Sequence, residues 1–165
     1  MSADSSDQKS IEMPASMASW DELMDFVRER ADACITDPGK SYRLLLAVEE
    51  LLSNIIRASS EHMQDASEQD PAASLPCSAM VRVCCTRLPA QHPGESAFTL
   101  FETYDNCPAY DPQLDLIPVE MDDIPIELRA IGGLGLFLVK SSVDQVDYEY
   151  VDDQNHYRLL VHDST

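Results

Sequence analysis

Residues 41–58 read SYRLLLAVEELLSNIIRA, and this stretch decides how the chain folds. Its apolar residues extend almost all the way around a helix, a pattern that is typical of a buried helix. A narrow polar stripe interrupts them, on one side of the helix. The stripe consists of Glu50, Ser53, Asn54 and Arg57. The stretch therefore predicts a buried helix that points a few polar groups at something.

The polar stripe has two interpretations. In the first, it is an ordinary solvated edge with ion pairs such as one between Glu50 and Arg57. In the second, Glu50 and Asn54 line a pocket, since a carboxylate can act as a base and an amide oxygen is a hard ligand suited to Mg²⁺. The helix alone does not decide between them.

The composition limits the classes of partner. A chain of 165 residues is long enough for one domain with a core, and 44% hydrophobic residues are ordinary for a globular protein. Eleven basic and 30 acidic side chains give a net charge of −19, which repels nucleic acid and anionic membranes and favours basic partner surfaces. We expect a cation to mediate any encounter with a nucleotide.

No targeting or disulfide pattern is visible. Without a basic start and apolar run, or a run of about 18 apolar residues, we expect a cytoplasmic protein with no signal peptide and no membrane span. The five cysteines form no C-x-x-C pair, so neither a disulfide framework nor a zinc site is expected.

The N-terminal half is expected to hold two helices. Residues 1–10 are polar, and we expect a flexible N-terminus there, followed by a short strand that ends at Pro14. A helix is predicted from Ser19, with Ser19 as N-cap and Glu22 completing a capping box. Beyond the central helix, residues 59–78 are acidic and show no period, so we expect a mobile surface loop.

The C-terminal half is expected to hold four strands, a lid and a helix. Four prolines exclude a long helix or strand from the segment at about 107–131, so we expect a lid there. Alternating residues predict strands at 79–87, 97–105, 146–151 and 156–161. The order of elements indicates an α+β fold, a two-layer α/β sandwich whose mixed, mostly antiparallel sheet carries helices on one face.

A glycine-rich junction precedes the last helix. Gly132, Gly133 and Gly135 lie where a loop becomes a helix, so free backbone amides and the helix dipole suit a phosphate there. Glycines before a helix are also common as plain turn residues. The pattern is neither a Walker loop nor part of a Rossmann unit.

Three segments in a fixed order carry a resemblance to a known family. They are the E-x-x-x-N helix with Glu50 and Asn54, the strand end YDNCPAYDP with Asp105, and RAIGGLGLFLVK after the lid. They resemble the ATP-binding domain of the gyrase, histidine-kinase and MutL (GHKL) superfamily, the Bergerat fold. The chain is most similar to the anti-sigma-factor serine/threonine kinases of bacterial partner-switching systems, which share the final D-x-V-x-Y strand at 144–148. We therefore expect one histidine-kinase-like ATPase domain at 11–163.

The resemblance implies a role for each matching residue. Glu50 would be the general base that takes a proton from the acceptor hydroxyl, Asn54 would hold Mg²⁺ against the phosphates, and Asp105 would accept a hydrogen bond from the adenine amino group. Backbone amides near the glycines would hold phosphate, with Arg129 as a charge partner. The implied ATP contacts are Asn54, Asp105, Ala109, Arg129, Gly132, Gly133, Leu134, Gly135 and Leu136.

Two hypotheses of different classes follow. The resemblance implies a kinase that uses ATP and Mg²⁺ to phosphorylate a Ser or Thr of a STAS-type antagonist protein, that sequesters a sigma factor, and that forms a homodimer. The chain departs from the family where Cys107 and Ala109 replace glycine-box positions and Ala58 replaces a histidine. The alternative is therefore a binding module with a degraded nucleotide pocket that acts by protein contact only.

Overall fold

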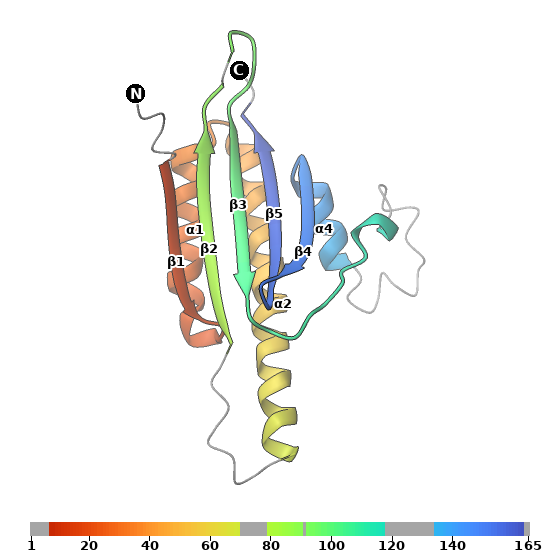
Figure 1. Ribbon diagram of the computed structural model, residues 1–165. Coiled ribbons are helices and arrows are strands. Elements are labelled where there is room, and N and C mark those ends of the chain that lie inside the picture. Colours follow the sequence, from red (N-terminus) through yellow and green to blue (C-terminus); the bar gives the residue numbers. More distant parts are fainter. Residues whose placement is uncertain (1–6, 70–78, 91, 118–133, 164–165) are drawn as a thin grey trace.

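The computed structural model describes residues 7–69, 79–90, 92–117 and 134–163. One sheet forms the first layer, and the helices cover only one of its faces (Figure 1). This is the two-layer α+β architecture expected from the order of elements. No helix of the described residues is long and apolar enough to cross a membrane.

The sheet has five strands in the order β1-β2-β3-β5-β4, and every pairing between them is antiparallel. The sheet was expected to be mixed and mostly antiparallel, and between neighbouring described strands it is entirely antiparallel, because β5 lies between β3 and β4, which run in the same direction. The strands are β1 (Asp7–Pro14), β2 (Met80–Leu88), β3 (Phe98–Asp105), β4 (Gln145–Val151) and β5 (Gln154–His162).

The start of the chain differs from the expected flexible segment. β1 begins at Asp7, four residues before the predicted strand, and pairs with β2 along its whole length. Residues 1–6 lie outside the described part. The polar residues 8–10 carry no hydrophobic signal, because β1 is an edge strand that is held mainly by its backbone hydrogen bonds to β2.

The helical layer contains two long helices and a short one. The helical segments are η1 (Met17–Ser19), α1 (Trp20–Cys34), α2 (Pro38–Gln69), η2 (Leu114–Leu116) and α4 (Leu134–Ser142). The expected capping box is not formed, since Ser19 ends a 3₁₀ turn, has φ −92° and ψ −4°, and makes no side-chain cap hydrogen bond. A cap residue needs an extended backbone instead.

Helix α2 extends further than predicted, and this is the largest error in the predicted secondary structure. Residues 59–69, expected to be a loop, continue the helix as far as Gln69, and residues 70–78 lie outside the described part. The segment has no amphipathic period, yet it contains no glycine or proline and includes helix-favouring Ala, Glu, Gln and Met. Pro71 is the first residue that opposes a helix.

The core lies between the helices and the inner face of the sheet. Helix α2 occupies the middle of the helical layer, with α1 and α4 on either side (Figure 1). The buried helix predicted from residues 41–58 is therefore confirmed. The largest fully buried apolar side chains are Leu23, Val27, Leu44, Val48, Leu51, Leu52, Val81, Val83, Phe101, Val139 and Leu159.

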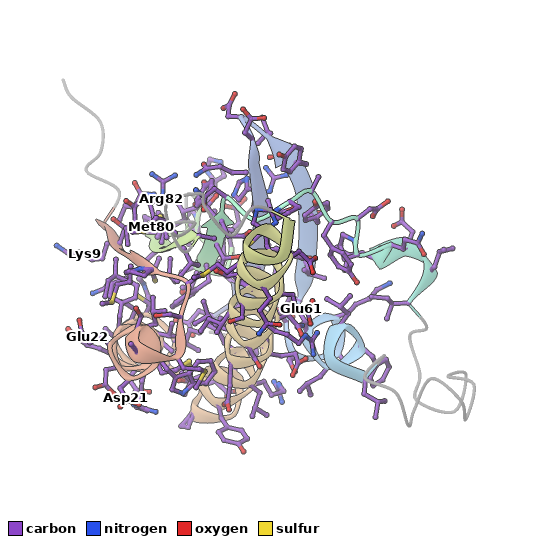
Figure 2. The ribbon with its side chains drawn as sticks, turned by 90° about the horizontal axis from the view of Figure 1, so that it is seen from below. Lys9, Asp21, Glu22, Glu61, Met80 and Arg82 are labelled. Atoms are coloured by element: carbon purple, nitrogen blue, oxygen red, sulfur yellow. The ribbon has the colours of Figure 1, made fainter. Side chains whose placement is uncertain are left out.

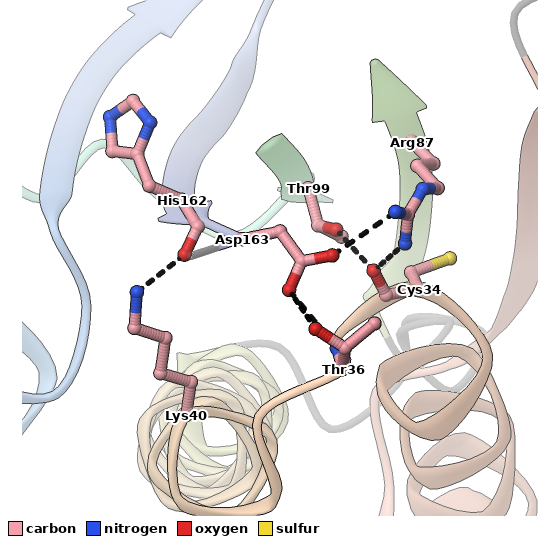
Figure 3. Close-up of polar contacts among 7 residues, drawn as sticks. All are labelled: Cys34, Thr36, Lys40, Arg87, Thr99, His162 and Asp163. Carbon is pink, nitrogen blue, oxygen red and sulfur yellow. Dashed lines mark hydrogen bonds and ion pairs between the residues drawn. The ribbon is translucent and has the colours of Figure 1, made fainter. Parts of the chain in front are cut away.

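A polar cluster ties the C-terminal end of β5 to the connection between α1 and α2 (Figure 3). The Asp163 carboxylate accepts hydrogen bonds from the Thr36 backbone N–H at 3.1 Å and from its hydroxyl at 2.6 Å. It also forms an ion pair with Arg87 at 3.1 Å, and Arg87 donates to the Cys34 carbonyl as well. The cluster joins both layers at one end of the molecule.

Candidate functional site

A cavity of about 60 Å³, which we call the Asp105 cavity, lies between α2 and the end of β3. It is smaller than the roughly 300–1,000 Å³ of pockets that hold small ligands. Because side chains alternate along a strand, Asp105 points inward with Thr103 and Phe101. The lining residues are Leu51, Asn54, Ile55, Ala58, Asp105, Cys107, Pro108, Tyr110, Asn155 and Tyr157.

Asp105 is 2% exposed and offers one carboxylate oxygen to the cavity. Its Oδ1 accepts hydrogen bonds from the Cys107 backbone N–H and from Asn155 Nδ2, both at 3.0 Å. The Cys107 thiol also hydrogen-bonds to the carboxyl, and among the described residues no backbone or amide N–H donates to Oδ2. Burial raises the pKa of this carboxyl, although the hydrogen bonds from Asn155, from the Cys107 backbone N–H and from the Cys107 thiol act in the opposite direction. One oxygen is thus held in place, and the other remains able to accept an N–H donor.

Asn155 holds Asp105 in this position, and the sequence analysis did not identify it. Its amide donates to Asp105 and to the carbonyls of residues 107 and 108, and its Oδ1 accepts from the Tyr148 hydroxyl at 2.8 Å and the Tyr110 N–H at 3.1 Å. The strands predicted at 146–151 and 156–161 leave Asn155 in the connection between them. The turn is in fact shorter, with positive φ only at residues 152–153, so β5 already includes Asn155.

Cys107 forms part of the cavity wall. Its side chain is 4% exposed, and its thiol contacts the Ile55 carbonyl at 3.8 Å. Burial, followed by the charge of Asp105, raises the pKa of the thiol to about 12. The thiol is therefore protonated at neutral pH and acts as a small packing group, and it fills space that a glycine would leave open.

Asn54 is held by its neighbours along α2. Its amide nitrogen donates to Glu50 Oε1 at 3.3 Å, and its Oδ1 accepts from Arg57 Nη2 at 2.8 Å. The oxygen that the sequence analysis assigns to Mg²⁺ is therefore bound to a guanidinium in this structure. The polar stripe therefore has features of both interpretations. Its side chains are hydrogen-bonded to one another, and Asn54 also lines the cavity.

Glu50 lies on the other side of the stripe. It does not line the Asp105 cavity but a separate groove of about 320 Å³. We call this the Glu50 groove. Its lining consists of Met17, Trp20, Leu46, Glu49, Glu50, Ser53 and Leu138. Two hollows thus open on either side of the hydrogen-bonded Glu50–Asn54 pair.

Gly135 permits close contact between α4 and Glu50. A Cβ atom placed on Gly135 would lie 2.0 Å from Glu50 Oε1 and 2.6 Å from its carboxyl carbon, far inside any normal contact distance. The first turn of α4 therefore packs its backbone directly against the Glu50 side chain. Gly135 was predicted only to take part in phosphate binding, and its contact with Glu50 is a second reason for a glycine at this position.

The other predicted site residues have mixed positions. Ala109 is exposed and does not line the cavity, although both its neighbours do. Leu134 and Leu136 are half-buried in the first turn of α4, where Leu136 packs against the core. Arg129, Gly132 and Gly133 lie outside the described residues.

The side-chain oxygens at the cavity suit a nucleotide that brings its own Mg²⁺ better than a metal ion held by the protein alone. Among the described residues, no group of three His, Cys, Asp or Glu side chains could hold a metal ion. Mg²⁺ commonly uses only one or two protein oxygens together with substrate phosphates. Asn54 Oδ1 can supply such an oxygen, and Asp105 Oδ2 can accept an amino hydrogen bond.

Comparison with known proteins agrees with this geometry. The family model described as a histidine kinase-like ATPase domain matches residues 13–160, which is well over half of the chain. The match runs from β1 to β5 and includes α2, the Asp105 cavity and α4. No curated protein matches the chain.

Proposed function

Because this chain belongs to the histidine kinase-like ATPase family, we propose that it is an ATP-dependent protein kinase of the anti-sigma-factor type. It would transfer phosphate to a Ser or Thr of a STAS-type antagonist protein. It would also bind a sigma factor and keep the sigma factor from RNA polymerase. A protein with this role would act in the cytoplasm. The family accounts for ATP binding, and the choice of acceptor and of sigma factor is our proposal.

The observation that carries the proposal is the position of the Glu50–Asn54 pair between two hollows. Asn54 lines the Asp105 cavity, whereas Glu50 lines the surface groove. Their side chains are joined by a hydrogen bond of 3.3 Å. Phosphate transfer to another protein requires that nucleotide and acceptor reach one point from two directions. This arrangement supports transfer to a protein hydroxyl rather than nucleotide binding alone.

Each residue then has a defined task. Asp105 Oδ2 accepts a hydrogen bond from the adenine amino group, and Asn155 keeps the carboxylate in place. Asn54 Oδ1 would hold Mg²⁺ in place of its present hydrogen bond from Arg57, and the Arg57 guanidinium would then be free to pair with phosphate. The bound magnesium nucleotide supplies the phosphoryl group. Glu50 accepts the proton of the attacking hydroxyl.

The charge of the chain supports a protein partner with a basic surface. A net charge of −19 attracts such a surface and speeds the encounter. We propose the sigma factor as this partner, bound by a homodimer of the chain. The same charge disfavours direct contact of this protein with nucleic acid or with anionic membranes.

Thermal unfolding with increasing MgATP tests nucleotide binding. A ligand at one hundred times its Kd stabilises the native state by about 2.7 kcal/mol, so the Tm should rise by roughly 5–10 °C. Phosphate transfer from radiolabelled ATP to a purified STAS-type protein of the same genome tests the kinase. Glu50→Gln should lower this transfer by about 10²-fold or more while MgATP still raises the Tm.

A non-catalytic binding module is the second candidate. The small cavity and the Cys107 side chain within it favour this reading. If MgATP at millimolar concentration leaves the Tm unchanged, while the chain still binds its sigma factor, the kinase proposal is wrong and the binding module is correct.

A further inference from the structure

We propose that the Glu50 groove is the docking site for the phosphate-accepting segment of the partner protein. The segment would carry its Ser or Thr between a large apolar side chain and a Lys or Arg. This inference rests on the proposed kinase function and adds to it the place and the chemistry of acceptor recognition.

The groove has the right position for an acceptor. It opens at the surface between the start of α1, the middle of α2 and α4. Glu50 is the residue of the polar stripe that is both half-buried and in the groove, and its carboxylate is fixed by Asn54 and by the backbone at Gly135. A hydroxyl that enters the groove can thus reach a carboxylate that is bonded to the wall of the nucleotide cavity.

The walls of the groove suit an apolar anchor. Met17 is 66% exposed and Leu138 is 36% exposed, and they face the groove together with the half-buried Trp20 and Leu46. Single exposed apolar residues are common on any protein, but four around one groove are typical of an interaction site. An apolar side chain next to the acceptor hydroxyl would cover them.

The charge of the groove selects a basic neighbour. Among the described residues that line it, only Glu49 and Glu50 are charged. Glu49 is exposed and has no hydrogen bond or ion pair to the described part of the chain. A Lys or Arg beside the hydroxyl would pair with the Glu49 carboxylate, whereas an acidic segment would be repelled.

Binding of a defined peptide to the full chain tests the inference. The probe is a nonapeptide with a central Ser, a Leu on one side and Arg on the other, added with Mg²⁺ and a non-hydrolysable ATP analogue. We expect amide NMR shifts at residues 17–20, 46–53 and 138. A second peptide with Glu in place of Arg should bind at least tenfold more weakly. Shifts confined to other residues, or no binding at millimolar peptide, would overturn the inference.

Charge reversal on α2 supplies matched variants. Glu49→Lys should weaken binding of the Arg peptide by roughly fivefold, because an exposed attraction becomes a repulsion. The control is Glu61→Lys, which makes the same charge change about three turns further along the exposed surface of α2 (Figure 2). If both variants weakened peptide binding equally, the net charge of the protein and not the groove would determine the affinity, and the proposal would be contradicted.

The two proposals fail in different ways. If the peptide binds in the groove but MgATP does not raise the Tm, the kinase function is wrong, and the groove is a peptide-binding site from which no phosphate is transferred. If MgATP binds and a STAS-type protein is phosphorylated with unchanged efficiency by Glu49→Lys and by Met17→Asp, the docking site is wrong and the kinase stands. A groove that becomes protected only as the chain dimerises would show a second copy as its occupant and would also refute the proposal.

Discussion

At the scale of single residues, Cys107 forms part of the wall of the Asp105 cavity. Its buried thiol contacts the Ile55 carbonyl and narrows a space of about 60 Å³. Cys107→Gly should raise ATP affinity, by on the order of fivefold, because it opens the wall beside Asp105. Isothermal titration with MgATP measures this change. Cys107→Val, which enlarges the side chain, should weaken binding, and equal affinities for both variants would show that the wall does not limit the site.

Gly135 offers a test in which stability and activity change in opposite directions. Gly135→Ala should favour helix α4 by up to about 1 kcal/mol, since Gly is a poor helix residue. The new Cβ would meet Glu50 Oε1 at 2.0 Å, so the carboxylate must move. We expect phosphate transfer to fall by roughly tenfold to a hundredfold, while urea unfolding shows an equal or higher stability.

Two further variants complete the Gly135 test. Ser141→Ala, in the same helix and exposed to solvent, should leave transfer unchanged. Glu50→Asp added to Gly135→Ala shortens the carboxylate and should recover part of the lost transfer. Full activity of Gly135→Ala alone would mean that the contact with Glu50 has no catalytic role.

At the scale of elements, the Asp163 cluster joins β5 to the α1–α2 connection. The Asp163 pKa is lowered below its ordinary 3.8, because hydrogen bonds from Thr36 and Arg87 outweigh the opposing effect of burial. Asp163→Asn should cost about 2 kcal/mol of unfolding free energy at neutral pH. Since the native pKa is the lower one, this stabilisation is complete well above pH 3.8 and is lost as the pH falls through the native value.

Urea unfolding across the acidic range measures the Asp163 effect. The difference between wild type and Asp163→Asn should shrink as the pH falls below 3.8. Asp25→Asn is the control, because Asp25 pairs with Arg28 on the exposed surface of α1 and should change stability by less than about 0.5 kcal/mol. A difference that does not depend on pH would mean that Asp163 acts through packing and not through charge.

The elements also show which sequence signals were sufficient. The apolar pattern of 41–58 predicted the central helix, and alternation predicted four strands close to their observed bounds. The first residues of β1 and the last turns of α2 were missed because neither has an amphipathic pattern. The first residues of β1 are held by backbone pairing with β2. The last turns of α2 form because their residues favour a helix and include no Gly or Pro. Periodicity reports burial, so it fails where an element extends beyond the core.

At the scale of the whole molecule, the site joins residues from distant parts of the chain. The family resemblance pointed to Glu50, Asn54 and Asp105, and their roles stay predictions. It did not show that Glu50 and Asn54 face different hollows, because one helical turn separates them on the same polar stripe. Nor did it reveal Asn155, whose role depends on the pairing of β3 with β5. These facts depend on tertiary packing and have no local signal.

The net charge of −19 affects the stability of the entire domain. Mutual repulsion of the carboxylates opposes the compact state, and salt screens it over a Debye length that falls from about 30 Å at 0.01 M to about 10 Å at 0.1 M. The Tm should therefore rise by a few degrees between 0.01 and 0.1 M NaCl and then level off. Differential scanning calorimetry measures this rise, and a nonelectrolyte such as sucrose at equal osmolality is the control.

The same screening determines how MgATP binding must be measured. Mg²⁺ alone should raise the Tm more than Na⁺ at equal ionic strength, since divalent cations gather around clustered carboxylates. A true nucleotide effect is the further rise when ATP is added at constant free Mg²⁺, and Asp105→Asn should reduce this rise without reducing the effect of Mg²⁺ alone. If Asp105→Asn lowers both effects equally, the stabilisation comes from general screening and the Asp105 cavity does not bind the adenine ring.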